Sequence, residues 1–194
     1  MSNTIVFFSI GNPGPQNRHS VGHLVLKQLT DAFETKQLVK KGKYSLTNLD
    51  NIMFVKSNAY MNESGRSLRA FLSSERIGNC TIVVVYDDFE LDLPKVRLQA
   101  LKKNESHNGV KSVQKELLSL PHQVYKLGVG VGPKPQGASK DAMANFVLSD
   151  FTLEQKSSIP TAMEAVYEYV HRIIETDGEV GDCNKLNSSV TKSL

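Results

Sequence analysis

The stretch "TIVFFSIGNPGPQNRHSVGHLVL", residues 4–26, indicates the fold class. Residues 4–10 form a short run of apolar, β-branched and aromatic side chains that stops at Gly11, which is typical of a buried strand. From Val21 to Phe33 the apolar residues follow helical spacing. A buried strand that leads into an amphipathic helix is characteristic of α/β proteins.

Strand and helix patterns alternate along the rest of the chain. Further strands are predicted at residues 52–56, 81–86, 95–100 and 125–131. Further helices are predicted after Asn62, around apolar residues 110, 113, 117 and 120, and after Thr152. The alternation predicts one compact α/β domain, a mixed and mostly parallel sheet flanked by helices. We expect this domain to span residues 1–184 and a polar C-terminal tail to span residues 185–194.

Three local signals refine the predicted helices. Asn62 is expected to act as an N-cap, because its side-chain oxygen can accept a free backbone N–H. Thr152 and Gln155 have the spacing of a capping box. Pro160 follows inside the same helical pattern, and we expect it to mark a kink or a restart.

Composition places the chain among ordinary globular proteins. The 194 residues are 40% hydrophobic and 22% charged, which excludes disordered and fibrous classes. A net charge of +3 is too small to indicate nucleic-acid binding by itself. Cys80 and Cys183 lie far apart, so we expect free thiols instead of a disulfide framework or a zinc site. The first predicted strand begins almost at Met1, and no apolar run could span a bilayer. The sequence therefore predicts a cytoplasmic protein with no membrane partner and leaves a mitochondrial location open.

Several polar side chains are predicted where strands end and helices begin, which is where ligands gather in α/β domains. The strand over residues 81–86 is expected to end at Asp87. The candidate site residues at this rim are His19, Asp87, Asn12, Asn62 and Asn108. Histidine can take a proton from water near neutral pH, a carboxylate can orient it, and asparagine NH₂ groups can hold a carbonyl or an oxyanion. The pattern favours hydrolysis by an activated water, although each asparagine taken singly is also a common helix cap.

Other kinds of site fit the sequence less well. His19 and His23 have the i, i+4 spacing of a metal pair, but Ser20 stands where a zinc protease needs glutamate and no third ligand lies nearby. The "GVGVG" run at residues 128–132 lacks the third glycine of a dinucleotide fingerprint. Strand glycines that allow close backbone approach are the preferred interpretation. We therefore expect neither a metal nor a cofactor.

Basic residues recur around the same loops. They are Lys95, Arg97, Lys102, Lys103, Lys111, Lys126, Lys134 and Lys140. Solvated surface lysines are the ordinary interpretation of such a series. Their grouping near the predicted rim also suits a phosphate-binding face.

Four motifs, in order and at matching spacing, resemble the bacterial-type peptidyl-tRNA hydrolases. They are "GNPGP…RHSVGH", "AYMNESGRSL", "VVVYDDFELDLPKVRL" and "SHNGVKSV". The resemblance covers nearly the whole chain. It implies a compact α/β fold around a mixed sheet and a monomer that needs no metal. It also implies hydrolysis of the ester between a peptide and the 3′ ribose of tRNA, with the tRNA acceptor stem and 3′ end as partners.

The resemblance implies a role for each candidate residue. His19 matches the histidine that activates water, and Asp87 matches the carboxylate that orients it. The family asparagines, which hold the peptide and the 3′-terminal adenosine, correspond to Asn12, Asn62 and Asn108. Lys126 falls where the family places a basic residue for the tRNA 5′-phosphate. The predicted phosphate contacts are Arg97, Lys102, Lys103 and Lys126.

This chain also departs from the family pattern. Only "PQN" separates Gly14 from Arg18, and Ser20 replaces an asparagine. Where the family has a glycine-rich loop before "HNG", this chain has "LKKNES". Gln99 stands where the family has a second basic residue of the clamp that binds the tRNA phosphate. We hypothesise that Lys102 and Lys103 compensate for the lost clamp residue.

Two other classes of function remain as alternatives. One is a non-catalytic RNA-binding relative of the same fold that serves as a splicing cofactor, and a site with His19, Asp87 and three asparagines argues against it. The other is a nucleotide-dependent oxidoreductase, which the incomplete glycine pattern disfavours. Ester cleavage of an N-blocked aminoacyl-tRNA distinguishes an enzyme from the first alternative, and cofactor binding tests the second.

Overall fold

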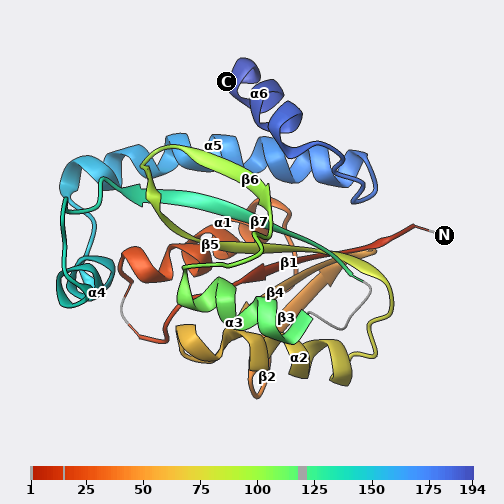
Figure 1. Ribbon diagram of the computed structural model, residues 1–194. Helices are drawn as coiled ribbons and strands as arrows, with labels where there is room; N and C mark the ends of the chain where they lie inside the picture. The colour runs from red at the N-terminus through yellow and green to blue at the C-terminus, as the bar shows by residue number, and fades with distance from the viewer. Residues whose placement is uncertain (1, 15, 118–121) are drawn as a thin grey trace.

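The computed structural model describes residues 2–14, 16–117 and 122–194, and in these residues it forms a seven-stranded mixed sheet (Figure 1). The strands are β1 (Thr4–Ser9), β2 (Val39–Lys41), β3 (Tyr44–Leu49), β4 (Ile52–Ser57), β5 (Cys80–Asp92), β6 (Val96–Ala100) and β7 (Gln123–Gly132). Their order is β2-β3-β4-β1-β5-β7-β6. The central strands β4, β1, β5 and β7 are parallel, while β2, β3 and β6 pair antiparallel at the two sides. The predicted fold class is confirmed.

Helices cover both faces of the sheet. They are α1 (Val21–Ala32), α2 (Ser64–Ser74), α3 (Asn108–Leu117), α4 (Lys140–Leu148), α5 (Leu153–Glu175) and α6 (Cys183–Ser193), with short 3₁₀ turns η1 (Arg18–Ser20) and η2 (Met61–Glu63). Helices α1 and α5 pack on one face, and α2 and α3 pack on the other (Figure 1). No helix of the described residues is long and apolar enough to cross a membrane.

Burial of the sheet on both faces explains the continuous apolar run in β1. Ile5 and Phe7 belong to the core under α1 and α5, while Val6 and Phe8 belong to the core under α2 and α3. Because successive side chains of a strand point to opposite faces, a central strand of such a sheet needs apolar residues at every position. The strand that leads to the candidate site is therefore fixed from both sides.

Strand β5 is longer than the sequence predicts. Instead of ending at Asp87, it continues to Asp92, with Asp87 paired to Val129 and Asp88 to Gly130 of β7. Both carboxylates are buried, and each has hydrogen-bond partners. Because these partners compensate the buried charges, the acidic residues can remain within the sheet.

Several other predictions about elements differ from the structure. The hairpin of β2 and β3 was not predicted, and the residue at the N-cap of α2 is Glu63, not Asn62. Helix α5 runs unbroken through Pro160, whereas the capping box of Thr152 and Gln155 is confirmed. Leu120 lies outside the described residues.

The C-terminal segment is a helix where the sequence suggests a polar tail over residues 185–194. Helix α6 buries Val190, and Leu186 packs against the same core. The side chain of Asn187 binds the backbone N–H and C=O of Leu98 on the outer edge of β6, at 2.9 Å each. The helix therefore completes the domain, because it covers an edge strand of the sheet.

Candidate active site

Turn η1 positions His19 between the end of β1 and the start of α1. The Ser20 hydroxyl accepts a hydrogen bond from the backbone N–H of Asn17 at 2.8 Å and donates one to its carbonyl at 3.1 Å. These two bonds close the turn that contains His19. Ser20, one of the departures from the family pattern, thus has a defined local role.

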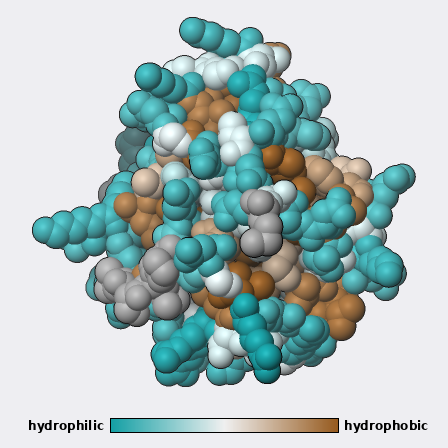
Figure 2. Space-filling model, turned by 90° about the vertical axis from the view of Figure 1, so that its right-hand side faces the viewer, coloured by the Kyte–Doolittle hydropathy of each residue, from teal (hydrophilic) through white to brown (hydrophobic). Residues whose placement is uncertain are grey.

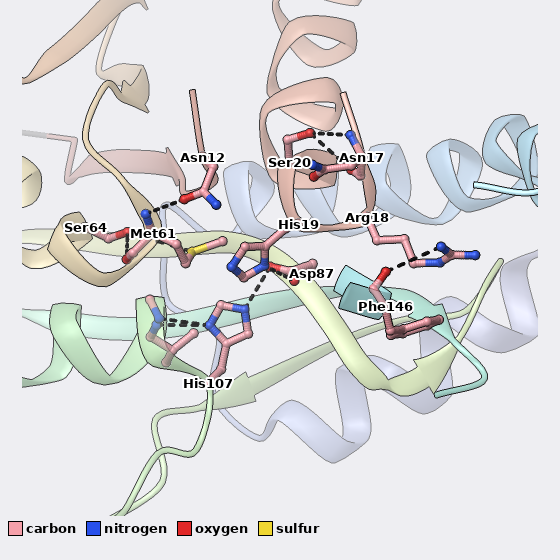
Figure 3. A network of polar contacts seen from close by, with 12 residues as sticks. Asn12, Asn17, Arg18, His19, Ser20, Met61, Ser64, Asp87, His107 and Phe146 are labelled. Carbon is pink, nitrogen blue, oxygen red and sulfur yellow. Dashed lines mark hydrogen bonds and ion pairs between the residues drawn. The ribbon is translucent and has the colours of Figure 1, made fainter. Parts of the chain in front are cut away.

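Asp87 joins two histidines. Its Oδ2 lies 2.7 Å from Nδ1 of His19, and its Oδ1 lies 2.8 Å from Nε2 of His107 (Figure 3). The carboxylate is completely buried, whereas the side chain of His19 is 15% exposed. The structure therefore confirms that His19 and Asp87 lie together and adds a second imidazole to them.

Hydrogen bonds of His107 define its tautomer. Its Nδ1 lies 3.1 Å from the backbone N–H of Gly109 and 3.3 Å from that of Val110, at the start of α3. A backbone N–H can only donate, so Nδ1 accepts and the ring proton is on Nε2. His107 therefore donates that proton to Asp87 and has no free nitrogen for other chemistry.

The same geometry leaves one free nitrogen on His19. When Nδ1–H of His19 donates to Asp87, the lone pair of Nε2 is available on the cavity side. Burial by itself raises the pKa of Asp87, but the electrostatic effect of His107 and hydrogen bonds from both histidines outweigh burial and lower this pKa below its usual range. Asp87 thus remains a carboxylate at neutral pH and can accept the Nδ1–H of His19.

A cavity of about 720 Å³ opens beside His19. Its lining includes the polar side chains of Asn12, His19, His107 and Asn108, and part of its wall consists of α4 residues Met143, Ala144, Val147 and Leu148. Asn12 accepts a hydrogen bond from the backbone N–H of Met61 at 2.7 Å, and its NH₂ group has no hydrogen-bond partner among the described residues (Figure 3). The cavity therefore combines a base, an amide donor and an apolar wall.

Asn62 lies outside this cavity. It is exposed and lines a second hollow of about 530 Å³ between α2 and α3. Asn108 lines both hollows, so they are adjacent. Three basic side chains line the second hollow, namely Arg66, Lys111 and Lys115.

Arg18 connects the turn that contains His19 to α4 and to the start of α5. Its guanidinium contacts the Ser149 hydroxyl, the Asp150 carbonyl at 2.8 Å and Gln155 Oε1 at 2.7 Å. It also stacks over the ring of Phe146, 4.5 Å from the centroid. Arg18 therefore fixes the apolar wall relative to His19.

The structure separates the predicted phosphate contacts into two groups. Lys102 and Lys103 are exposed. Lys126 is only 3% exposed and pairs with Glu105 at 2.8 Å, and Arg97 pairs with Asp88 at 2.9 Å. Lys126 is thus buried and paired in this structure, and the phosphate role that the family resemblance implies for it stays a prediction.

His23 does not join the site. Its Nδ1 lies 2.9 Å from the Ser9 hydroxyl. Burial and the nearby Lys56 lower the pKa of His23 to about 4, despite partial compensation from Gly11 and Asp87. It is a structural histidine one turn beyond His19.

Potential metal ligands in the described residues form one group, in which ligand atoms of His19, Asp87 and His107 lie within 4.8 Å of one another. These atoms already satisfy one another through hydrogen bonds. A cation among them would displace a ring proton. The prediction that the site needs no metal remains a prediction.

The glycines of "GVGVG" lie within β7 and open no phosphate loop. A Cβ on Gly130 would lie 2.5 Å from the carbonyl oxygen of Asp92, which is too close for any side chain. Close approach of the backbone is therefore the reason for glycine at this position, as the sequence suggests.

The sequence alone assigns no role to His107. It directly precedes Asn108 at the start of a predicted helix, and a ring nitrogen there can accept free backbone N–H groups. That position was an available signal for a structural role. Its contact with Asp87 depends on the tertiary fold, which local patterns do not give.

Comparisons with known proteins show the family to which the chain is similar. The family model described as Peptidyl-tRNA hydrolase matches residues 6–193. The peptidyl-tRNA hydrolase of Prochlorococcus marinus (strain MIT 9215) is 29% identical over 192 residues, covering 95% of this chain and 96% of the relative. That of Clostridium botulinum (strain Alaska E43 / Type E3) is 30% identical over 176 residues, covering 87% and 88%.

A solved structure shows the same fold. The crystal structure of peptidyl-tRNA hydrolase from Acinetobacter baumannii superimposes with a TM-score of 0.77 at 22% identity, and the match covers 96% of each chain. The family match extends from β1 to the end of α6 and includes every candidate site residue. The chain belongs to the peptidyl-tRNA hydrolase family.

Proposed function

We propose that this protein hydrolyses the ester bond between a peptide and the 3′ ribose of tRNA, with His19 as the general base. The observation that carries the proposal is the orientation of His19, whose Nδ1 contacts the buried Asp87 at 2.7 Å while the ring borders the cavity. Membership of the family supports the same activity.

The proposed reaction needs only water and the side chains of the site. His19 Nε2 takes a proton from water as the water oxygen attacks the ester carbonyl carbon. Asp87 stabilises the imidazolium that forms. When the tetrahedral intermediate collapses, the ester C–O bond breaks and His19 returns the proton to the departing ribose oxygen. The products are a free peptide carboxyl group and tRNA with a free ribose hydroxyl.

Asparagine side chains are suited to hold the reacting ester. The free NH₂ of Asn12 is a neutral donor at the same end of the cavity as His19, where it can contact the carbonyl or the oxyanion. Asn108 lies between the two hollows and can contact the 3′ end of the tRNA. The apolar wall of α4 is suited to the peptide.

The tRNA would approach from the side of α2 and α3. The hollow beside Asn62 and Asn108 contains Lys111 and Lys115, which can neutralise backbone phosphates, and Arg66, which pairs with Glu63 at 3.1 Å. Lys102 and Lys103 are exposed and provide further charge. We propose that these residues, and not Lys126 or the paired Arg97, govern affinity and its dependence on salt.

The proposed enzyme acts as a monomer, since one chain supplies the base, the carboxylate and the asparagines. Its substrate arises where ribosomes translate. We propose the cytoplasm as its location, with the mitochondrion as the alternative.

The decisive assay incubates the protein with an N-acetylated aminoacyl-tRNA and measures release of the N-acetylated amino acid. We expect release far above the spontaneous rate of ester hydrolysis, with a KM that rises with salt. Tight binding of the tRNA without ester cleavage would instead identify an RNA-binding protein without catalytic activity.

A further inference from the structure

The loop between β6 and α3 contains one buried carboxylate among exposed residues. Lys102, Lys103, Asn104 and Ser106 are exposed, whereas the side chain of Glu105 is only 2% exposed. Glu105 Oε2 lies 2.8 Å from Nζ of Lys126, whose side chain is 4% exposed. A buried ion pair thus joins this loop to strand β7.

Further hydrogen bonds hold the loop around the pair. Glu105 Oε1 accepts the backbone N–H of Lys102 at 2.6 Å. Gln114 of α3 donates to the carbonyls of Lys102 and Lys103, and its Oε1 lies 3.5 Å from the backbone N–H of Glu105. The loop is therefore attached both to the sheet and to the helix that begins at Asn108.

The ion pair lies close to His107, the imidazole that donates to Asp87. Nζ of Lys126 is 5.7 Å from the ring centroid of Tyr86, and the Tyr86 ring packs edge-on against His107 at 5.2 Å between centroids. Along the chain, Glu105 precedes His107 by two residues. A shift of Glu105 would therefore move the imidazole that donates to Asp87, and with it the start of α3.

A phosphate would have to separate Lys126 from Glu105. The carboxylate would then remain buried without a compensating charge, which is strongly unfavourable. Lys102 and Lys103 are exposed on the same loop and offer a phosphate the same charge without this cost.

We propose that Glu105 and Lys126 are positioning residues that hold His107 and Asn108 in place, and that Lys126 serves the loop instead of the tRNA. The inference rests on the proposed hydrolase activity for its kinetic consequences. Its structural part, the alignment of His107 with Asp87, stands independently of the substrate.

Steady-state kinetics of Lys126→Met and Glu105→Gln test the proposal. We expect kcat to fall about 10-fold or more in each variant, with little change in KM or in the salt dependence of KM, because misplaced reacting groups slow the chemical step. The double variant removes both buried charges, and we expect it to recover part of the lost kcat. Lys103→Met is the comparison from the same loop, with an expected rise in KM and an unchanged kcat.

A tRNA-contacting Lys126 would give the opposite pattern. Lys126→Met would then raise KM, leave kcat unchanged and reduce the salt slope of binding by about one phosphate contact. Unchanged kcat and KM in both single variants would also overturn the proposal. If Lys126→Met does not fold, Glu105→Gln and the double variant supply the comparison.

Nitrogen-15 spectra of the histidine rings separate failure of this inference from failure of the proposed function. In the wild type we expect His107 to show a protonated Nε2 and an unprotonated Nδ1. Loss of that pattern in Glu105→Gln supports the positioning role even if the wild type cleaves no peptidyl-tRNA. Retention of the wild-type pattern in both single variants contradicts it.

Discussion

Asp87 determines which imidazole can act as a base. Its two oxygens accept one ring proton each, from His19 and His107. His107 uses its remaining nitrogen to accept backbone N–H groups, whereas His19 keeps a free nitrogen at the cavity. Two histidines on one carboxylate thus have different roles because of what their far nitrogens contact.

His23 provides a prediction for stability at acidic pH. Its folded-state pKa is about 4, below that of an unfolded histidine near 6.5, so between these values the unfolded state binds more protons. Stability should therefore fall as pH falls through this window. Between pH 6.5 and 4.5 we expect the wild type to lose about 2–3 kcal/mol more free energy of unfolding than His23→Gln.

Urea titrations of both proteins at the two pH values measure this difference. All other titrating groups are shared, so the comparison isolates His23. Parallel losses in wild type and variant would show that His23 does not remain neutral in the folded protein.

At the scale of elements, close packing of α2 against α3 brings Asn62 near Asn108. A Cβ on Gly65 of α2 would lie 2.2 Å from the carbonyl oxygen of Ser112 in α3. The hydroxyl of Ser112 also accepts the backbone N–H of Gly65 at 2.9 Å. The second hollow thus depends on a small residue at this contact.

Gly65→Ala should separate the two helices. We expect the free energy of unfolding to fall by about 1–3 kcal/mol, since the backbone of α3 must move to make room. Gly78→Ala is the matched control, because no atom lies within 4 Å of its added Cβ, and its effect should be small. Urea titration measures both variants, and equal stability of Gly65→Ala and the wild type would refute the close contact.

Local patterns predicted the elements whose apolar residues recur regularly, such as β1, β5 and α1. They did not predict β2, which is wholly exposed, or β3, whose buried residues include the polar Ser45 and Thr47. The extension of β5 through Asp87 was also not predicted, because the partners of Asp87 come from η1 and from the loop before α3. Hydrogen bonds between distant elements compensate the buried charge, and a one-dimensional pattern does not contain them.

At the scale of the whole molecule, α4, which lines the cavity, lies at one end of the sheet, and α6 lies away from α4 (Figure 1). The face of the molecule at which β1 begins is mostly hydrophilic, with apolar residues in separate patches (Figure 2).

Helix α6 has buried or partly buried Cys183, Leu186 and Val190 at helical spacing. Because the remaining residues are mostly polar, the sequence suggested a tail.

Asn187 tests whether α6 belongs to the cooperative domain. Its side chain binds both backbone groups of Leu98 and accepts the Tyr169 hydroxyl at 2.6 Å. We expect Asn187→Ala to lower the free energy of unfolding by about 1–3 kcal/mol. Asn184→Ala, at an exposed position of the same helix, should change it by less than about 0.5 kcal/mol. Thermal or urea unfolding that does not distinguish the variants would indicate that α6 contributes little.

The approximate position of His19, Asp87 and the asparagines was predictable, because each lies near the end of a predicted strand or the start of a predicted helix. The way they divide between two hollows was not, since it depends on the packing of α2, α3 and α4. The burial of Lys126 could not be predicted either, because the sequence does not show that Glu105 pairs with this lysine.

Hydrolysis of N-acetylated aminoacyl-tRNA by His19→Ala tests the central claim most directly. We expect kcat to fall by about 100-fold or more, because the variant lacks the imidazole that is proposed to take the proton from water, while tRNA affinity stays near that of the wild type. His23→Gln, one turn away, should retain the wild-type rate at neutral pH. Ester cleavage by His19→Ala at a rate close to that of the wild type would contradict the account.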